Sequence, residues 1–536
     1  MEFRILGPLE VVHEERAVAL GGNRERVLLA ILLLSANRVV SSERLAEDLW
    51  AGRPPEGASQ ALRVYVSRLR KSLREAGGGG LLVTQPPGYM ARVEPAALDA
   101  TRFEALLAQG RHEAGTGDHH RAAATLRQGL SLWRGPALAD LADAPFARAE
   151  AARHVARQVL VTDADCYGRP WLVSNIMREG LGRNLFTVTG EEWSKRRRMV
   201  TPVFTRAHGD ELARLMSATL ADELDGWQLG SVADIQGPLT DLTLRVAARA
   251  LLGVDTTQDD LGRRLRDHFE VVLGWLSHRF SHPAAPPAAV PTARNRAFLQ
   301  ERDQLRAVVG ELIARRRTSS DGPMDVLGLL LESGLSDDEI VQECVGWLFA
   351  GHETTASTLA WALYSLAVAP EIQARVAAEG DALSTAPTVR DVDGLDYTGR
   401  VVEETLRLYP AGVGIARSAR RPTVLAGRRL RRRTIVLISV YSIQRDRRRW
   451  PRPEVFDPER FKTDHRAHLP FGLGARQCLG ARFAAMEARL ALAMISSRWD
   501  VHYDGAGPPR PAITPALRID GGLPVDLRPR VAALSD

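Results

Sequence analysis

Residues 468–484, HLPFGLGARQCLGARFA, set one cysteine, Cys478, between a glycine-rich loop and the start of an alanine-rich helix. Glycines at 472, 474 and 480 permit positive φ angles and let backbone N–H groups approach the sulfur. The following helix directs the positive end of its dipole at the same atom. We therefore expect the loop to lower the thiol pKa and to present Cys478 as a thiolate, the form that ligates a metal.

A lone cysteine is more often a buried, inert side chain. Here, however, every fixed position of the pattern F-x-x-G-x-R-x-C-x-G is present. The segment resembles the haem-thiolate loop of the cytochrome P-450 family. The resemblance implies haem b with Cys478 as its axial iron ligand, in a loop formed by Phe471, Gly472, Arg476 and Gly480. In that loop Phe471 shields the sulfur, and Arg476 reaches an anionic group alongside.

Two further segments carry the same resemblance. In EETLRLYP (403–410), Glu404 and Arg407 are three residues apart and can pair on one helix face. Such a pair is commonplace on a surface, but in the family it is buried and joined by an arginine, here Arg460 of FDPERF (456–461). In GEEWSKRRRMVTPVF (190–204), the resemblance assigns Trp193 and Arg197 to a haem propionate.

Weaker family positions for propionate contact are occupied by Arg417 and His468. Arg417 is equally compatible with an ordinary surface position.

The segment LFAGHETTASTLAW (348–361) predicts the oxygen-activating part of the site. Gly351 inside a helix costs about 1 kcal/mol relative to alanine, so it needs a structural reason. The Thr354 hydroxyl can compete for the Ala350 carbonyl and widen the helix into a pocket for dioxygen. Glu353 and Thr354 then form an acid–alcohol pair that relays protons. The alternative is a polar cap on an otherwise buried helix.

The resemblance implies a monooxygenase that inserts one atom of dioxygen into a small lipophilic substrate. No flavin or nicotinamide fingerprint is found in the 536 residues, so a ferredoxin or flavodoxin with its reductase is the expected electron donor.

Residues 1–95 follow the order strands, three helices and hairpin. In the helix predicted over 60–74, an apolar stripe lies opposite a polar face suited to the major groove of duplex DNA. That face contains Gln60, Arg63, Ser67, Arg70 and Lys71. An ordinary amphipathic helix with a solvated basic face is the alternative.

The segments RILGPLEV (4–11), ALRVYVSRLRKSL (61–73) and PPGYMARV (86–93) resemble the response-regulator type of winged helix, and more specifically the antibiotic-regulatory-protein family. LDATRFEALL (98–107) and LSLWRG (130–135) resemble the start of that family's helical-repeat bacterial transcriptional activation domain. The repeats stop near residue 158, because the helix over 145–160 is the last repeat helix that the sequence predicts.

The expected fold is mainly α: a winged helix-turn-helix (1–95), partial helical repeats (96–160) and an N-terminally truncated cytochrome P-450 domain (161–536). Within this domain only residues 161–186 precede the helix that carries Trp193. The strand within 434–446 should then lack its usual neighbours, so we expect it to expose an apolar edge. A rival to the oxygenase is a transcription regulator whose P-450-like domain senses a ligand or haem without turnover.

Composition points to a soluble cytoplasmic protein. Three scattered cysteines exclude a disulfide framework, and the apolar run 27–34 is too short to span a bilayer. No basic-then-apolar signal segment opens the sequence. The formal net charge is +6, and we interpret the basic runs 428–434 and 445–450 as solvated loops.

Overall fold

The computed structural model describes residues 1–50, 55–115, 118–135, 137–141, 155–205, 208–257, 260–318, 325–426, 428–447, 449–462 and 468–530. The chain forms two compact units. Unit 1 contains residues 1–166 with the short segments 421–432 and 446–451, and unit 2 contains the rest. Most of the helix predicted over 145–160 lies outside the described residues.

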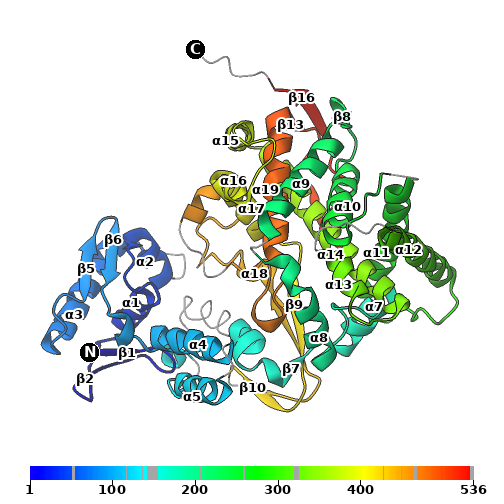
Figure 1. Ribbon diagram of the computed structural model, residues 1–536. Helices are drawn as coiled ribbons and strands as arrows, with labels where there is room; N and C mark the ends of the chain where they lie inside the picture. The colour runs from blue at the N-terminus through cyan, green and yellow to red at the C-terminus, as the bar shows by residue number, and fades with distance from the viewer. Residues whose placement is uncertain are drawn as a thin grey trace. The chain divides into compact units, whose positions relative to one another are not determined.

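Unit 1 begins with a winged helix-turn-helix (Figure 1). An antiparallel sheet β1-β2-β3 is followed by three helices and a second sheet of order β4-β6-β5. The elements are β1 (Glu2–Arg4), β2 (Glu10–His13), β3 (Arg16–Ala17), α1 (Asn23–Leu34), β4 (Val40–Ser41), α2 (Ser42–Leu49), α3 (Ala58–Glu75), β5 (Leu82–Gln85) and β6 (Gly88–Ala91). Ser41 caps α2 by accepting a hydrogen bond from the Arg44 N–H.

The helical pair α4 (Asp99–Gly115) and α5 (His119–Leu130) follows the winged helix. Both oxygens of the buried Asp99 carboxylate accept backbone N–H bonds, from Ile5 at 2.8 Å and Leu6 at 2.9 Å. Leu138 and Leu141 pack into the same core as the strands and helices of the winged helix. The first 95 residues therefore share their core and hydrogen bonds with residues up to 141.

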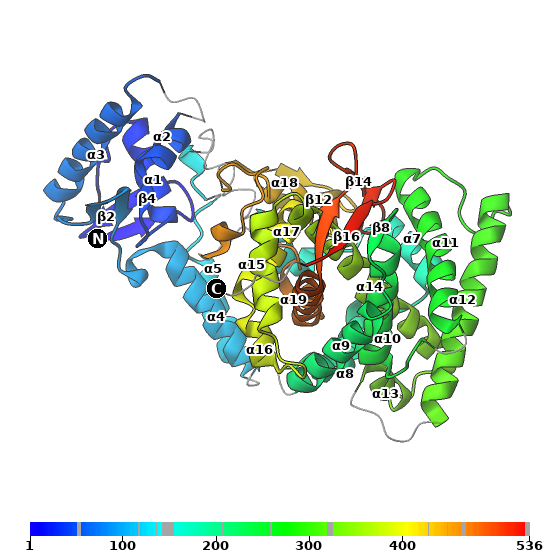
Figure 2. The same cartoon turned by 90° about the horizontal axis from the view of Figure 1, so that it is seen from above.

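Unit 2 is mainly α-helical. Its helices are α7 (Trp171–Leu181), α8 (Gly190–Val200), α9 (Gly209–Leu224), α10 (Gln236–Leu252), α11 (Leu261–Ser281), α12 (Ala293–Thr318), α13 (Val326–Leu331), α14 (Asp337–Ala367), α15 (Pro370–Asp381), α16 (Val389–Gly394), α17 (Asp396–Leu408), α18 (Val440–Ile443) and α19 (Ala481–Arg498). Figures 1 and 2 both show the long α11 and α12 side by side at one end of the unit.

The core of unit 2 is built around α14. This 31-residue helix begins at a capping box, in which Ser336 and Glu339 satisfy each other's backbone N–H groups. It packs along α10 and contacts α19, and its side chains are buried through most of its length. Figure 2 shows α10 and α14 running together, with α19 seen nearly end-on beside them. A helix buried on nearly all sides is the natural place for a central site.

Three small sheets complete unit 2. Their strand orders are β12-β9-β7, β13-β16-β8 and β14-β15. The strands are β7 (Tyr167–Gly168), β8 (Gly230–Val232), β9 (Gly414–Ala419), β12 (Ile435–Ser439), β13 (Trp499–Tyr503), β14 (Arg510–Ile513), β15 (Leu517–Asp520) and β16 (Val525–Pro529). A further hairpin, formed by β10 (Thr423–Leu425) and β11 (Arg428–Leu430), belongs to unit 1.

The predicted apolar edge is confirmed. β12 is the outer strand of its sheet, and its Ile435 and Leu437 are 58% and 69% exposed. In the described part of the chain, no helix has both the length and the apolar character needed to cross a membrane.

Candidate functional site

The Cys478 loop folds tightly against the start of α19. Gly472 and Gly474 have φ angles of 71° and 78°, values that only glycine adopts readily. The Cys478 N–H donates to the Phe471 carbonyl at 2.9 Å, and Gly480 is the N-cap residue of α19. Cys478 therefore lies at the N-terminal end of a helix, as the sequence predicts.

The pKa of Cys478 differs from the sequence-based expectation. The side chain is open to solvent, yet the protein around it excludes enough water to raise the thiol pKa above its ordinary value. The Gly480 N–H and Arg197 act in the opposite direction but do not outweigh this desolvation. In this chain the loop alone therefore does not favour the thiolate.

Arginines from distant parts of the sequence gather near this loop. Arg197 of α8 donates to the Gln477 carbonyl at 3.1 Å, which ties it to the residue before Cys478. Arg476 lies over the Trp193 ring, 4.4 Å from its centroid, and donates to the Val188 carbonyl. The guanidinium of Arg197 lies 5.6 Å from the same ring. The sequence-predicted Trp193, Arg197 and Arg476 thus form one cluster.

Three more arginines add to this positive charge. Burial, then Arg169, Arg417, Arg420 and Arg197, lower the pKa of Arg476 to about 9. Burial, followed by Arg417, lowers the pKa of Arg169 to about 10. Burial also lowers the pKa of Arg417, whose Nη1 donates to the Ala416 carbonyl.

This cluster calls for an anion. The Nη1 atom of Arg476 is buried and has no hydrogen-bond partner among the described residues. Buried arginines that depress one another's pKa are stabilised when a negative group binds between them. Sequence reasoning missed Arg169, because only the pairing of β7 with β9 brings it alongside Arg417. It also missed Arg420, which directly follows β9.

His468 lies at the other side of the loop. Its Nδ1 is 2.9 Å from a carboxylate oxygen of Glu403 in α17, and its ring lies 5.0 Å from that of Phe461. The structure therefore shows His468 against α17, beside Glu403 and Phe461.

Glu404, Arg407 and Arg460 come together as the resemblance implies. Arg407 donates to both Glu404 oxygens, at 2.6 Å and 2.8 Å, and Arg460 donates to one of them at 3.0 Å. Glu404 and Arg407 are fully buried. Arg407 also donates to the carbonyls of Gln444 and Val455, so this ion pair joins α17 to the chain that leads to the Cys478 loop.

The α14 segment shows both agreement and difference. The Thr354 hydroxyl donates to the Ala350 carbonyl at 2.9 Å, as predicted. The predicted widening is absent, because α14 is a continuous α-helix through this segment. Close packing explains the glycine at position 351, because a Cβ atom there would come within 2.9 Å of Ala247 on α10. The Glu353 carboxylate is paired with Arg518 of β15 rather than with Thr354.

Glu487 of α19 is a buried acid that sequence reasoning missed. It is fully buried, and neither carboxyl oxygen has a hydrogen-bond partner among the described residues. Burial raises its pKa well above the ordinary value, while the nearby Thr355 hydroxyl lowers it to a smaller extent. The sequence signal that could have revealed this buried acid is a glutamate at an apolar position of an amphipathic helix.

In unit 1, α3 presents the predicted amphipathic surface. Leu62, Val66, Leu69 and Leu73 are buried, as the periodicity indicates. Gln60, Arg63, Ser67 and Lys71 are exposed. Arg70 differs, because it donates to the Leu82 carbonyl at 3.0 Å and the Thr84 hydroxyl at 2.6 Å and is thus held by the β5-β6 hairpin. A cavity of about 560 Å³ runs along this face, lined by Arg63, Val66, Ser67, Arg70, Lys71, Arg74 and Tyr89.

Together, the Cys478 loop, the arginine cluster and α14 define a candidate site for an anionic, metal-containing cofactor with a thiolate ligand. Comparison with known families agrees with that class. The family model for cytochrome P450 matches residues 151–521. The models named bacterial transcriptional activator domain and transcriptional regulatory protein, C terminal, match residues 98–167 and 15–91. The chain belongs to the cytochrome P450 family, as a P450 monooxygenase domain preceded by bacterial regulator domains.

Several characterised P450s are similar to this chain. A cyclooctat-9-en-7-ol 5-monooxygenase of Streptomyces melanosporofaciens is 35% identical over 342 residues, which cover 60% of this chain and 73% of the relative. Cyclooctatin synthase of the same organism is 34% identical over 359 residues, 64% of this chain and 78% of the relative. Pentalenene oxygenase of Streptomyces avermitilis is 31% identical over 369 residues, 66% and 82% of the two chains.

Proposed function

We propose that the chain binds haem b through the Cys478 thiolate and hydroxylates or epoxidises a small lipophilic substrate. The observation that carries this proposal is the juxtaposition of Cys478 with an arginine cluster in which the charges that act on Arg476, among the described residues, are all positive. When bound, haem supplies dioxygen activation: one oxygen atom enters the substrate and the other leaves as water, at the expense of two electrons and two protons.

The residues present fit this cofactor. The two carboxylates of haem b are the anions that the cluster requires, and Arg197, Arg417 and Arg476 would hold them, with Trp193 as a further donor. Placing carboxylates there satisfies the buried Nη1 of Arg476. Cys478 would hold the iron, and a bound metal would stabilise its thiolate against the desolvation that raises the thiol pKa.

Within α14, we assign proton delivery to Glu353 and Thr354. The Thr354 hydroxyl is already polarised by its bond to the Ala350 carbonyl. Glu353 is the adjacent acid, and it can exchange protons with water once it releases a bond to Arg518. The two residues would move protons from solvent towards the reacting oxygen, while the apolar core around α14 excludes bulk water.

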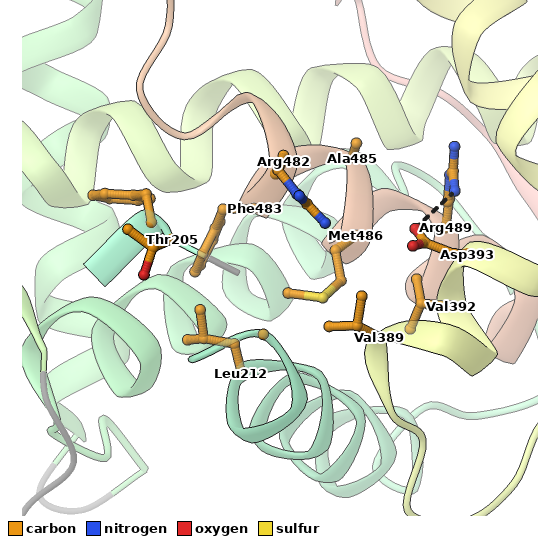
Figure 3. A pocket seen from close by; sticks show the side chains of 12 residues that line it. Thr205, Leu212, Val389, Val392, Asp393, Arg482, Phe483, Ala485, Met486 and Arg489 are labelled. Atoms are coloured by element: carbon orange, nitrogen blue, oxygen red, sulfur yellow. Dashed lines mark ion pairs between the residues drawn. The ribbon is translucent and has the colours of Figure 1, made fainter. Parts of the chain in front are cut away.

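Electrons are proposed to come from a ferredoxin or flavodoxin and its reductase. Arg482 is exposed in the first turn of α19, four residues after Cys478. Arg482 borders a cavity of about 350 Å³ between α9, α16 and α19, which Phe483 and Met486 also line (Figure 3). An exposed cation this close to the cysteine suits an acidic electron carrier.

The substrate class follows from the relatives. Those compared above are named for cyclooctat-9-en-7-ol, cyclooctatin and pentalenene. We propose a cyclic olefin or an alcohol derived from one as the first compounds to test in a spectral binding screen.

Unit 1 is proposed to bind duplex DNA through the exposed face of α3. Support comes from the basic cavity along α3 and from the matched regulator models. This module favours one second candidate, a regulator whose P450 domain senses a ligand or haem without turnover.

Turnover with a surrogate ferredoxin, its reductase and NADPH separates the two candidates. A monooxygenase converts a bound compound into a product containing one atom of labelled dioxygen. A protein that binds haem and the compound but forms no labelled product is a sensor.

A further inference from the structure

The Glu353 side chain is fixed by an ion pair that no sequence motif indicated. Arg518 of β15 donates through Nε to one carboxylate oxygen at 2.8 Å and through Nη2 to the other. The Glu353 side chain is 1% exposed, whereas that of Arg518 is 30% exposed. The pair therefore runs from the buried centre of α14 to the solvent.

The position of Arg518 is itself held by α14. The carbonyl of its neighbour Leu517 accepts from the Ser357 hydroxyl and from the Trp361 Nε1, both at 2.7 Å. Glu353, Ser357 and Trp361 follow one another at intervals of four residues, so they share one face of the helix. Three side chains of α14 thus fasten two consecutive residues of β15.

Arg518 supplies the positive charge that faces the buried Glu353 carboxylate. Among the described residues, it is the one cation within ion-pair distance of Glu353. The neighbouring His352 does not contribute a charge, because burial lowers its pKa and its Nδ1 contacts the Leu348 carbonyl at 2.6 Å. A buried carboxylate without its partner is strongly disfavoured.

We propose that Arg518 is a positioning residue for proton delivery, holding the Glu353 side chain in place and linking this buried acid to solvent. The inference rests on the proposed Glu353–Thr354 relay. To pass a proton, Glu353 exchanges one Arg518 N–H for a water molecule, takes up a proton that the solvent supplies through this water, and hands it on towards Thr354. The guanidinium then restores the carboxylate position for the next transfer.

Cumene hydroperoxide tests this role without knowledge of the natural substrate. Two-electron cleavage of its O–O bond requires the hydroperoxide proton to move to the departing cumyloxy oxygen, and the product is 2-phenyl-2-propanol. One-electron cleavage needs no such transfer, because the cumyloxyl radical loses a methyl radical and becomes acetophenone. The ratio of alcohol to ketone therefore reports proton relay in the haem-loaded protein.

We expect Arg518→Gln to lower this ratio by about an order of magnitude, within the range of general acid–base effects. Arg518→Lys should give an intermediate ratio, and added guanidinium should partly restore Arg518→Ala. The double variant Arg518→Gln with Glu353→Gln should match Glu353→Gln alone, because Arg518 acts through Glu353. Arg528→Gln, which breaks an exposed pair with Asp526 on β16, is the matched control.

Two outcomes overturn the proposal. One is an unchanged ratio in Arg518→Gln or Arg518→Lys while Glu353→Gln lowers it, which leaves the relay intact and removes Arg518 from it. The other is additive losses in the double variant, which indicate a purely structural role. If Glu353→Gln also leaves the ratio unchanged, the relay itself is wrong, and Arg518 has nothing to position. The carbon monoxide spectrum of each variant separates these results from a loss of haem binding.

Discussion

Glu487 provides a sharp test of the electrostatics around the α14–α19 contact. Its carboxyl group is fully buried, and the Thr355 hydroxyl donates to the Gly351 carbonyl instead of to it. Burial raises its pKa well above the ordinary value of 4.5. The folded protein therefore keeps this group protonated at a pH where the unfolded chain ionises it.

This difference fixes the sign of a pH effect. Above pH 4.5, unfolding releases the Glu487 proton, so rising pH favours the unfolded state. The penalty grows by about 1.4 kcal/mol for each pH unit until the carboxyl of the folded chain also ionises. Glu487→Gln keeps the size of the side chain and removes its titration. Between pH 5.5 and 7.5 the stability of the variant relative to the wild type should therefore rise with pH.

Urea unfolding of the full chain, followed by tryptophan fluorescence at pH 5.5, 6.5 and 7.5, measures this gain. Glu270→Gln, at an exposed position of α11, is the control and should show no pH-dependent difference. The reasoning is refuted if Glu487→Gln and the wild type keep a constant stability difference over this range. That result would mean that Glu487 is ionised in the folded protein.

Three other predictions follow from the two units. Thr354→Ala should retain haem binding but release more hydrogen peroxide per electron consumed, because proton delivery is lost. The control Thr358→Ala, one turn away, should not release more. Equal coupling of electrons to product in both variants would contradict the relay. Arg63→Ala should weaken specific DNA binding by about 1–3 kcal/mol if Arg63 contacts a base edge. A uniform loss of affinity on all sequences, with a dependence of log affinity on log salt that is smaller by about one unit, would instead assign Arg63 to a phosphate. A fragment of residues 1–141 should unfold cooperatively at a higher urea concentration than one of residues 1–95. The reason is that the shorter fragment lacks Asp99, which accepts two N–H bonds, and the buried Leu138 and Leu141. Equal midpoints would mean that the folding unit ends at residue 95.

Local patterns predicted the parts of the site that depend on neighbouring residues. The glycines at 472 and 474 give the loop its positive φ angles, and the alternating four- and three-residue spacing of apolar residues gives α3 its buried stripe. The Thr354 bond to Ala350 likewise depends only on helical spacing.

Sequence reasoning failed where distant segments decide the outcome. Arg518 meets Glu353 only because Ser357 and Trp361 hold β15 along α14. Arg169 joins the arginine cluster only through the β7–β9 pairing. The raised pKa of Cys478 has the same origin, because desolvation depends on every segment packed around the loop.

The central claim is that Cys478 is the thiolate ligand of a haem iron. The most direct measurement is the absorption spectrum of the haem-loaded protein after reduction and addition of carbon monoxide. The account predicts the red-shifted Soret band of thiolate ligation in the wild type and in a Cys166→Ser control, and its loss in Cys478→Ala. An imidazole-type band in the wild type, or an unchanged band in Cys478→Ala, would contradict it.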